Sequence, residues 1–163
     1  IICRGDHYFF NTSAPHSVDM YDFLELITAA RNAQRQGGED HATTLFEDAL
    51  GLYRGDLFAD DTGNESFETY RVQLRHSYLD AVRTVATAQI RRNRAGDAIR
   101  VLRAALALES VAVDLQEMLI NQLSRLGRHS EARQQYESCR IALRRQLDME
   151  PPERMRALEQ LFH

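Results

Sequence analysis

Apolar residues recur every three or four positions along most of the chain after residue 18, which is the spacing of one face of a helix. The start differs, because residues 1–10 carry β-favouring side chains around a Gly-Asp turn and residues 11–17 form a polar linker. We therefore predict an all-α chain with a short N-terminal extended segment. The predicted helices span about 19–36, 40–53, 67–93, 97–108, 113–126 and 130–147, followed by a short one after Pro151 and Pro152.

Two segments of the chain repeat one pattern of small and large side chains. Their offset of about 34 residues is the period of the helix–turn–helix unit in tetratricopeptide (TPR) repeats, in which small side chains let paired helices approach closely. A third copy over 42–52 precedes the copy over 98–108 by more than one such period, which indicates an insertion that covers much of 57–75. We predict a TPR-like α-α superhelix in which the repeat positions are buried. Ala98, Leu102 and Ala105 coincide with Ala132, Tyr136 and Cys139.

The insertion follows Arg54, Gly55 and Asp56 and continues as an acidic loop. We interpret Gly55 as the glycine that ends the preceding helix, since a left-handed backbone costs glycine little. The same triplet is an adhesion motif and recurs at residues 4–6, but three residues recur by chance and nothing else in the sequence indicates an extracellular protein. The acidic side chains lack the ligand spacing of a calcium loop. A solvated loop that pairs with Arg54 or Arg71 is therefore the favoured interpretation.

The sequence contains no recognisable catalytic or cofactor-binding motif. Its six histidines show no zinc-type spacing with one another or with the two cysteines, and it lacks a nucleophile elbow, a phosphate loop and a dinucleotide fingerprint. Cys139 occupies a small-residue position of the repeat, so we predict an inert, buried thiol. We therefore expect no enzymatic activity, no metal and no cofactor.

Composition and charge narrow the class of protein. Hydrophobic residues make up 44% and charged residues 27%, with no membrane-spanning run and no signal peptide, so we expect a cytoplasmic globular protein with reduced thiols. All twenty basic residues are arginine; residues 1–81 hold six against 14 acidic residues, and residues 82–163 hold 14 against ten. This asymmetry favours a macromolecular contact surface. The chain starts at Ile1, so we expect it to be part of a longer protein.

Five arginines fall close to the predicted turns between helices. Two of them, Arg94 and Arg128, are related by the repeat offset, so we expect the set to line one edge of the array. A solvated edge is the simplest interpretation, and a contact with DNA phosphate or RNA polymerase is the functional alternative. The five residues are Arg91, Arg92, Arg94, Arg125 and Arg128.

Two separated blocks of the sequence resemble the bacterial transcriptional activation domain of SARP-type regulators, over about residues 18–162. The second block runs from Leu126 through Tyr136 to Pro151. Three positions depart from the family, which usually has Trp at residue 67, Gly at residue 148 and Pro at residue 110. The first block comprises Leu52-Tyr53-Arg54-Gly55-Asp56-Leu57, the acidic loop, the aromatic Phe67, and the spacing Arg71-x-x-Leu74-x-x-x-Tyr78.

The resemblance implies that residues 18–163 form a TPR-like module that follows a winged-helix DNA-binding domain. Residues 4–10 resemble the last strand of its wing, so residues 1–17 are expected to be its remnant and a linker. The implied role is non-enzymatic: the module holds the DNA-binding domain in register, helps the regulator to form a homodimer, and contacts the transcription machinery. DNA would be read only by the upstream domain, while Phe67, Leu74 and Tyr78 would anchor the long helix.

Two other functions remain open from the residues alone. A small-molecule effector would bind the concave face or the 55–66 loop in a ligand-sensing module and shift the state of the regulator. A free-standing TPR scaffold would instead bind peptides. A winged helix upstream in the parent protein would exclude the scaffold.

Overall fold

The computed structural model describes residues 2–4, 7–9, 19–56 and 65–162, with side chains for 19–56 and 68–162. In this part of the chain the predicted all-α class is confirmed. β1 (Ile2–Arg4) and β2 (His7–Phe9) form an antiparallel pair near the N-terminus. The helices are α1 (Asp19–Arg35), α2 (Glu39–Leu52), α3 (Glu65–Arg91), α4 (Ala95–Leu108), α5 (Val113–Arg125), α6 (His129–Leu147) and α7 (Glu153–Arg156), followed by a 3-10 helix over Ala157–Phe162.

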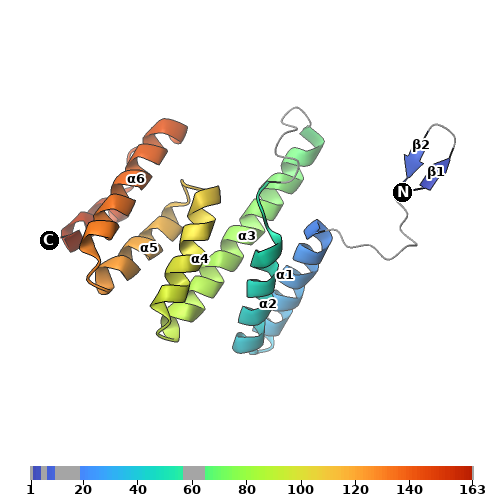
Figure 1. Ribbon diagram of the computed structural model, residues 1–163, viewed down its shortest axis with the longest axis horizontal. Coiled ribbons are helices and arrows are strands. Elements are labelled where there is room, and N and C mark those ends of the chain that lie inside the picture. The colour runs from blue at the N-terminus through green and yellow to red at the C-terminus, as the bar shows by residue number, and fades with distance from the viewer. Residues whose placement is uncertain (1, 5–6, 10–18, 57–64, 163) are drawn as a thin grey trace.

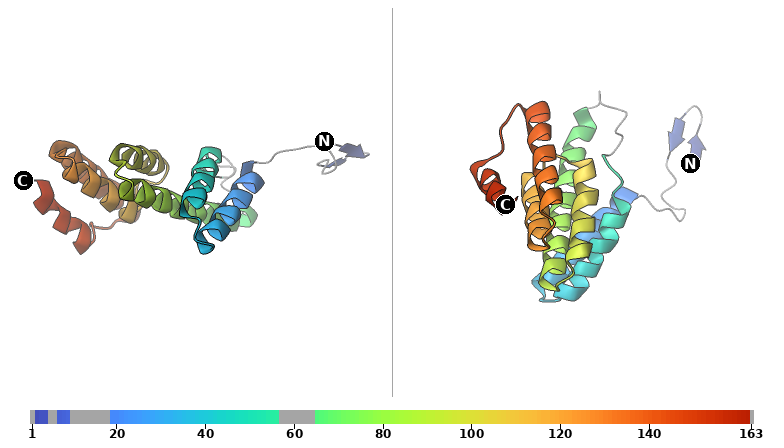
Figure 2. Two further views of the ribbon diagram at one scale, coloured as in Figure 1. Left: turned by 90° about the horizontal axis from the view of Figure 1, so that it is seen from below. Right: turned by 60° about the vertical axis from the view of Figure 1, so that its left-hand side comes forward.

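The helices form three antiparallel pairs, α1 with α2, α3 with α4, and α5 with α6, which lie side by side in a row (Figures 1 and 2). Each pair contacts mainly the next one, as expected for stacked repeats. The 3-10 helix covers α5 and α6 at the C-terminal end, where Phe162 lies beside the Tyr136 ring with centroids 5.7 Å apart. The structure therefore agrees with a TPR-like array.

The turns inside the three pairs are copies of one backbone motif. The second residue after each first helix has a positive φ, and the residue that follows it donates its N–H to the carbonyl five positions earlier, which is a Schellman motif. The copies follow one another at the same spacings as the three copies of the sequence pattern, so the predicted repeat register is confirmed. The positive-φ residues are Gly37 (82°), Asn93 (59°) and Gly127 (70°), and the donors are Gly38 to Ala33 (2.9 Å), Arg94 to Gln89 (2.8 Å) and Arg128 to Leu123 (2.9 Å).

The repeat positions identified from the sequence form the core between paired helices. Ala105 and Cys139 are fully buried, and Tyr136 is 2% exposed. The apolar stripe of α3 is buried as well, including Leu74 and Tyr78. The predicted burial of the repeat positions is therefore confirmed.

The described part of the insertion between the first two pairs is helical. Helix α3 has 27 residues where α5 has 13, and its N-terminal end projects beyond α4 (Figure 1). Phe67 lies in α3, but its side chain is outside the described residues, so its anchoring role stays a prediction. Asp60 and Asp61, expected to be exposed, also lie outside them.

The predicted role of Gly55 at the end of α2 is wrong. The helix ends at Leu52, and its C-cap Tyr53 has an extended backbone rather than leading into a left-handed cap. Gly55 does have a positive φ, but its value of 138° lies outside the left-handed helical region. Glycine is still favoured there because other side chains rarely adopt such a φ. The positive φ of Gly55 therefore belongs to a bend that follows α2, not to the end of the helix.

Candidate functional site

The segment after α2 is fixed to α3 and α4 by a small polar cluster. The Asp56 carboxylate accepts hydrogen bonds from the Tyr53 hydroxyl at 3.2 Å and from Arg75 Nε at 3.2 Å. Arg75 also pairs with Glu109 at the end of α4, at 3.3 Å. The arginine that pairs with Asp56 is therefore Arg75, one turn beyond Arg71 on α3, rather than Arg54 or Arg71. Asp56, Tyr53, Arg75 and Glu109 are called the junction cluster below.

Aromatic packing completes the junction cluster. The Tyr53 ring stacks on Tyr78 with centroids 4.2 Å apart and lies 5.7 Å from Phe23 of α1. Burial, and secondly the Asp56 carboxylate, raise the pKa of Tyr53 to about 12. Its hydroxyl therefore remains protonated at neutral pH and keeps donating to Asp56. The cluster is suited to a structural role rather than to acid–base chemistry.

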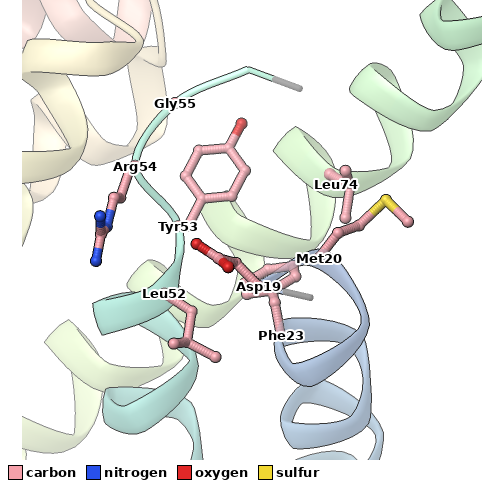
Figure 3. Close-up of a pocket in the computed structure, with 8 residues that line it drawn as sticks. All are labelled: Asp19, Met20, Phe23, Leu52, Tyr53, Arg54, Gly55 and Leu74. Carbon is pink, nitrogen blue, oxygen red and sulfur yellow. The ribbon is translucent and has the colours of Figure 1, made fainter. Parts of the chain in front are cut away.

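Arg71 was one of the two arginines expected to pair with the acidic residues that follow α2, and in the structure it pairs with one of them. Its side chain is 7% exposed, and its guanidinium pairs with Glu68 at 3.2 Å. Arg54, in contrast, is exposed, and its side chain points away from the Tyr53 ring (Figure 3). Only Arg71 of these two arginines therefore stabilises the start of α3 through an acidic neighbour.

A cavity of about 150 Å³ lies beside the junction cluster, between the first turn of α1, the end of α2 and α3. Tyr53 points inward, and Phe23, Met20 and Leu74 lie around it (Figure 3). Sites for small molecules generally measure about 300–1,000 Å³. This cavity is therefore too small to support the effector-sensing interpretation by itself.

The five arginines expected at one edge do lie at the turns that join the helices of the α3–α4 and α5–α6 pairs. These turns are aligned along the lower edge of the array in Figure 1. Arg94 and Arg128 are the N-caps of α4 and α6. Arg91, Arg92, Arg94, Arg125 and Arg128 are called the turn edge below.

Ion pairs occupy most of the turn edge. Arg91 pairs with Glu39 at 3.0 Å, and Arg92 pairs with Asp40, so both bind the start of α2. Arg128 pairs with Glu131 at 2.6 Å, and together with Arg103 it lowers the pKa of that carboxyl to about 2. These three arginines are thus already paired within the domain.

In the part of the chain with described side chains, the arginine of the α5–α6 turn that is equivalent to Arg91 has no acidic residue opposite it. Arg125 stands one repeat period after Arg91, but Ala95 occupies the place that Glu39 has in the first repeat. Among the described residues, the Arg125 side chain has no ion-pair partner. The adjoining Leu126 is 50% exposed. An exposed cation beside an exposed apolar side chain therefore marks the α5–α6 turn.

The remaining chemistry of the described residues is structural. Burial raises the pKa of Cys139 to about 11, and its Sγ lies 3.7 Å from Met155 Sδ. Within residues 19–56 and 68–162, no cluster of histidine, cysteine and carboxylate side chains is suited to a metal ion. None of the helices described is both long and apolar enough to cross a membrane.

Comparison with known proteins assigns the family. The sequence profile of the bacterial transcriptional activator domain matches residues 18–161. The chain belongs to this family. Members are domains of transcriptional regulators and are not enzymes, so the expectation of a non-enzymatic domain is confirmed by family membership.

Individual relatives support the same assignment to SARP-type regulators. The regulatory protein AfsR of Streptomyces coelicolor is 27% identical over 160 residues, covering 98% of this chain and 16% of AfsR. The regulatory protein DnrI of Streptomyces peucetius is 27% identical over 145 residues, covering 89% of this chain and 53% of DnrI. The domain therefore spans about a sixth to a half of these relatives.

A solved structure shows the same fold. Mycobacterium tuberculosis EmbR, in complex with a low-affinity phosphopeptide, superposes with a TM-score of 0.66 and is 26% identical. The match covers 88% of this chain and 38% of EmbR. The activator domain is thus one part of a larger regulator in this relative too.

Sequence reasoning missed two polar residues, Arg75 and Gln89, that the structure places in contact with residues outside their own helix. Arg75 belongs to no motif, and its partner Asp56 is distant in the sequence, before the insertion. Gln89 had a detectable signal, because it stands at the repeat position that Leu123 occupies one unit later. A polar residue at an apolar repeat position indicates a local function or a local cost.

Proposed function

We propose that this domain is the protein-contact domain of a SARP-type transcriptional regulator, and that it binds RNA polymerase or a second protomer through Arg125 and Leu126 at the α5–α6 end of the turn edge. Residues 18–163 would form this module, and residues 1–17 would link it to an upstream winged-helix domain that reads DNA. The observation that carries the proposal is the exposed pair of Arg125 and Leu126 at the α5–α6 turn.

Protein contact accounts for this surface better than DNA contact. DNA-binding surfaces gain affinity from several cations that are free to neutralise phosphates. Three arginines of the turn edge are instead paired with carboxylates of the domain itself. Protein interfaces combine apolar side chains with arginine, which is among the residues that contribute most to their binding energy. Arg125 and Leu126 provide that combination.

The test is made in the full-length regulator. We expect Arg125→Glu to lower promoter activation at least fivefold, equivalent to about 1 kcal/mol of contact energy, without changing promoter affinity. Arg91→Gln is the matched control, because it occupies the same turn position one repeat earlier but is paired with Glu39. Wild-type activation by Arg125→Glu, or an equal loss of promoter binding, would contradict the proposal.

A further inference from the structure

A groove of about 500 Å³ runs between α2 and α4 with α3 beneath it. It is separate from the cavity beside the junction cluster. Gln89 and Arg94 line one end, and Leu50 and Val101 lie farther along. The groove therefore offers a polar end and an apolar wall.

Gln89 is the unusual residue of this groove. Its backbone carbonyl closes the α3–α4 turn, as those of Ala33 and Leu123 close the other two turns. Only 5% of Gln89 is exposed. Its Nε2 donates to Glu47 of α2, but no donor among the described residues reaches its Oε1. A buried carbonyl without a partner is unfavourable for folding, and the other turns avoid it with apolar side chains.

Among the described side chains that line the groove near Gln89, Arg94 is the cation without an acidic partner. Glu47 accepts the hydrogen bond from Gln89, and Asp97 accepts one from Arg100 at 2.9 Å. The Arg94 side chain is exposed and has no partner within residues 19–56 and 68–162. A ligand that fits this end must therefore supply an N–H donor for Gln89 and an anionic group for Arg94.

The length of the groove favours a peptide. Arg94 and Ala104, both in its lining, are ten residues apart on α4, which corresponds to about 15 Å. An extended chain covers that length with about five residues. Val101 lies about 10 Å along α4 from Arg94, so it would meet a side chain about three residues from the anionic group.

We propose that the α2–α4 groove binds a short extended segment of a partner protein that carries an acidic side chain. A backbone N–H of the segment donates to Gln89 Oε1, its carboxylate pairs with Arg94, and an apolar side chain rests on Leu50 and Val101. This inference goes beyond the proposed contact of the turn edge, which depends on Arg125 and Leu126. Peptide binding is measured on residues 1–163 alone, whereas the turn-edge contact is tested by promoter activation. A negative peptide result would therefore not contradict the proposed turn-edge contact.

The experiment uses a panel of fluorescent, end-blocked pentapeptides of leucine and alanine with one aspartate at each position in turn. Asparagine replaces the aspartate in the matched panel, and fluorescence anisotropy reports binding. We expect at least one aspartate peptide to bind with a Kd below about 1 mM, and at least tenfold more tightly than its asparagine counterpart. Failure of every aspartate peptide to bind, or equal binding of the two panels, would overturn the proposal.

Two variants assign the binding to the groove. Gln89→Leu copies the next repeat and should keep or raise the melting temperature while weakening the peptide at least tenfold. Arg94→Gln should weaken it to a similar extent and remove the preference for aspartate. Arg128→Gln is the control, because it changes the equivalent N-cap, whose side chain is paired with Glu131, and should bind normally.

Unchanged affinity in Gln89→Leu or Arg94→Gln would overturn the proposal. A lower melting temperature of Gln89→Leu would also count against it, because Gln89 would then serve the fold. Arg94→Gln leaves Gln89 in place, so its binding curve remains decisive in that event.

Discussion

At the scale of single residues, small side chains set the distance between paired helices. Ala105 of α4 is fully buried, whereas Ala107 of the same helix is exposed. Arginine at position 105 would overfill the core and bury a charge. We therefore expect Ala105→Arg to lower the free energy of unfolding by at least about 4 kcal/mol, and Ala107→Arg by less than about 0.5 kcal/mol. Denaturant unfolding measures both, and equal stabilities would disprove the repeat alignment.

Cys139 shows what burial does to a reactive group. Burial first, and then the Glu117 carboxylate, raise its pKa from 9.0 to about 11. The folded protein therefore favours the neutral thiol, and this contribution to stability is present below about pH 9 and lost as the pH rises toward 11. In a Cys3→Ser background, we expect Ellman's reagent at pH 8 to label Cys139 only after denaturation. Rapid labelling of the native protein would show that the thiol is accessible.

Single residues also show where prediction from sequence ends. The burial of Ala105 and Cys139 followed from the repeat offset, because equivalent positions share one environment. The Asp56–Arg75 pair did not, because its two residues stand on opposite sides of the insertion and belong to no repeat position. The side-chain carbonyl of Gln89, which lacks a hydrogen-bond donor among the described residues, could not be predicted either. Its surroundings depend on Glu47, which belongs to another helix.

At the scale of elements, the junction cluster joins α2, α3 and α4. Asp56 is 29% exposed in its side chain and Arg75 40%, so solvent weakens their attraction. We expect Asp56→Asn to cost about 1 kcal/mol of unfolding free energy, because it weakens the bonds from Tyr53 and Arg75. The double change Asp60→Asn with Asp61→Asn should cost less than about 0.5 kcal/mol. If denaturant unfolding gave the reverse order, the acidic loop would be the structural element.

The start of α3 carries a second prediction at this scale. If Phe67 fills the pocket in which the family usually has Trp, Phe67→Ala should cost roughly 3–5 kcal/mol of unfolding free energy. Leu74→Ala, at a buried position, should cost roughly 2–5 kcal/mol. Val72 is 57% exposed, so Val72→Ala is the neutral control. A neutral Phe67→Ala would show that the aromatic position does not anchor the helix.

Most element boundaries were predictable, and the exceptions have physical causes. Gly37 and Gly127 end their helices because a Schellman turn requires a left-handed residue. Asn93 makes the same turn with a less obvious signal, since asparagine tolerates positive φ. The end of α2 was misjudged at Gly55 because that glycine serves a bend farther along the chain.

At the scale of the whole molecule, the described helices pack against one another in pairs, and we expect none of them to act as a recognition helix in a DNA groove. Specific recognition needs side chains at base edges. We expect residues 1–163 alone to bind DNA weakly, without sequence preference, and to lose that binding as salt is raised, because only phosphate attraction is available and the net charge is −4. Fluorescence anisotropy with promoter and scrambled duplexes at two salt concentrations measures this.

Restoring the upstream segment is the positive control and should create specific binding. Tight, sequence-selective binding by residues 1–163 alone would overturn the assignment of DNA reading to another domain. The repeat offset made the overall architecture predictable from sequence, but it carries no information about partners. The structure was needed to show that Arg125 lacks an ion-pair partner among the described residues and that Gln89 Oε1 lacks a hydrogen-bond donor there.

Helix α3 also has a mechanical consequence. Its 27 residues form a rod of about 40 Å, so a rotation of about 5° around one end displaces the other by about 3.5 Å. The projecting end bears the exposed side chains of Tyr70 and Val72, while the other end holds the α3–α4 turn with Gln89. A partner that tilted α3 as a rigid rod by binding at Tyr70 would therefore also displace the floor of the α2–α4 groove.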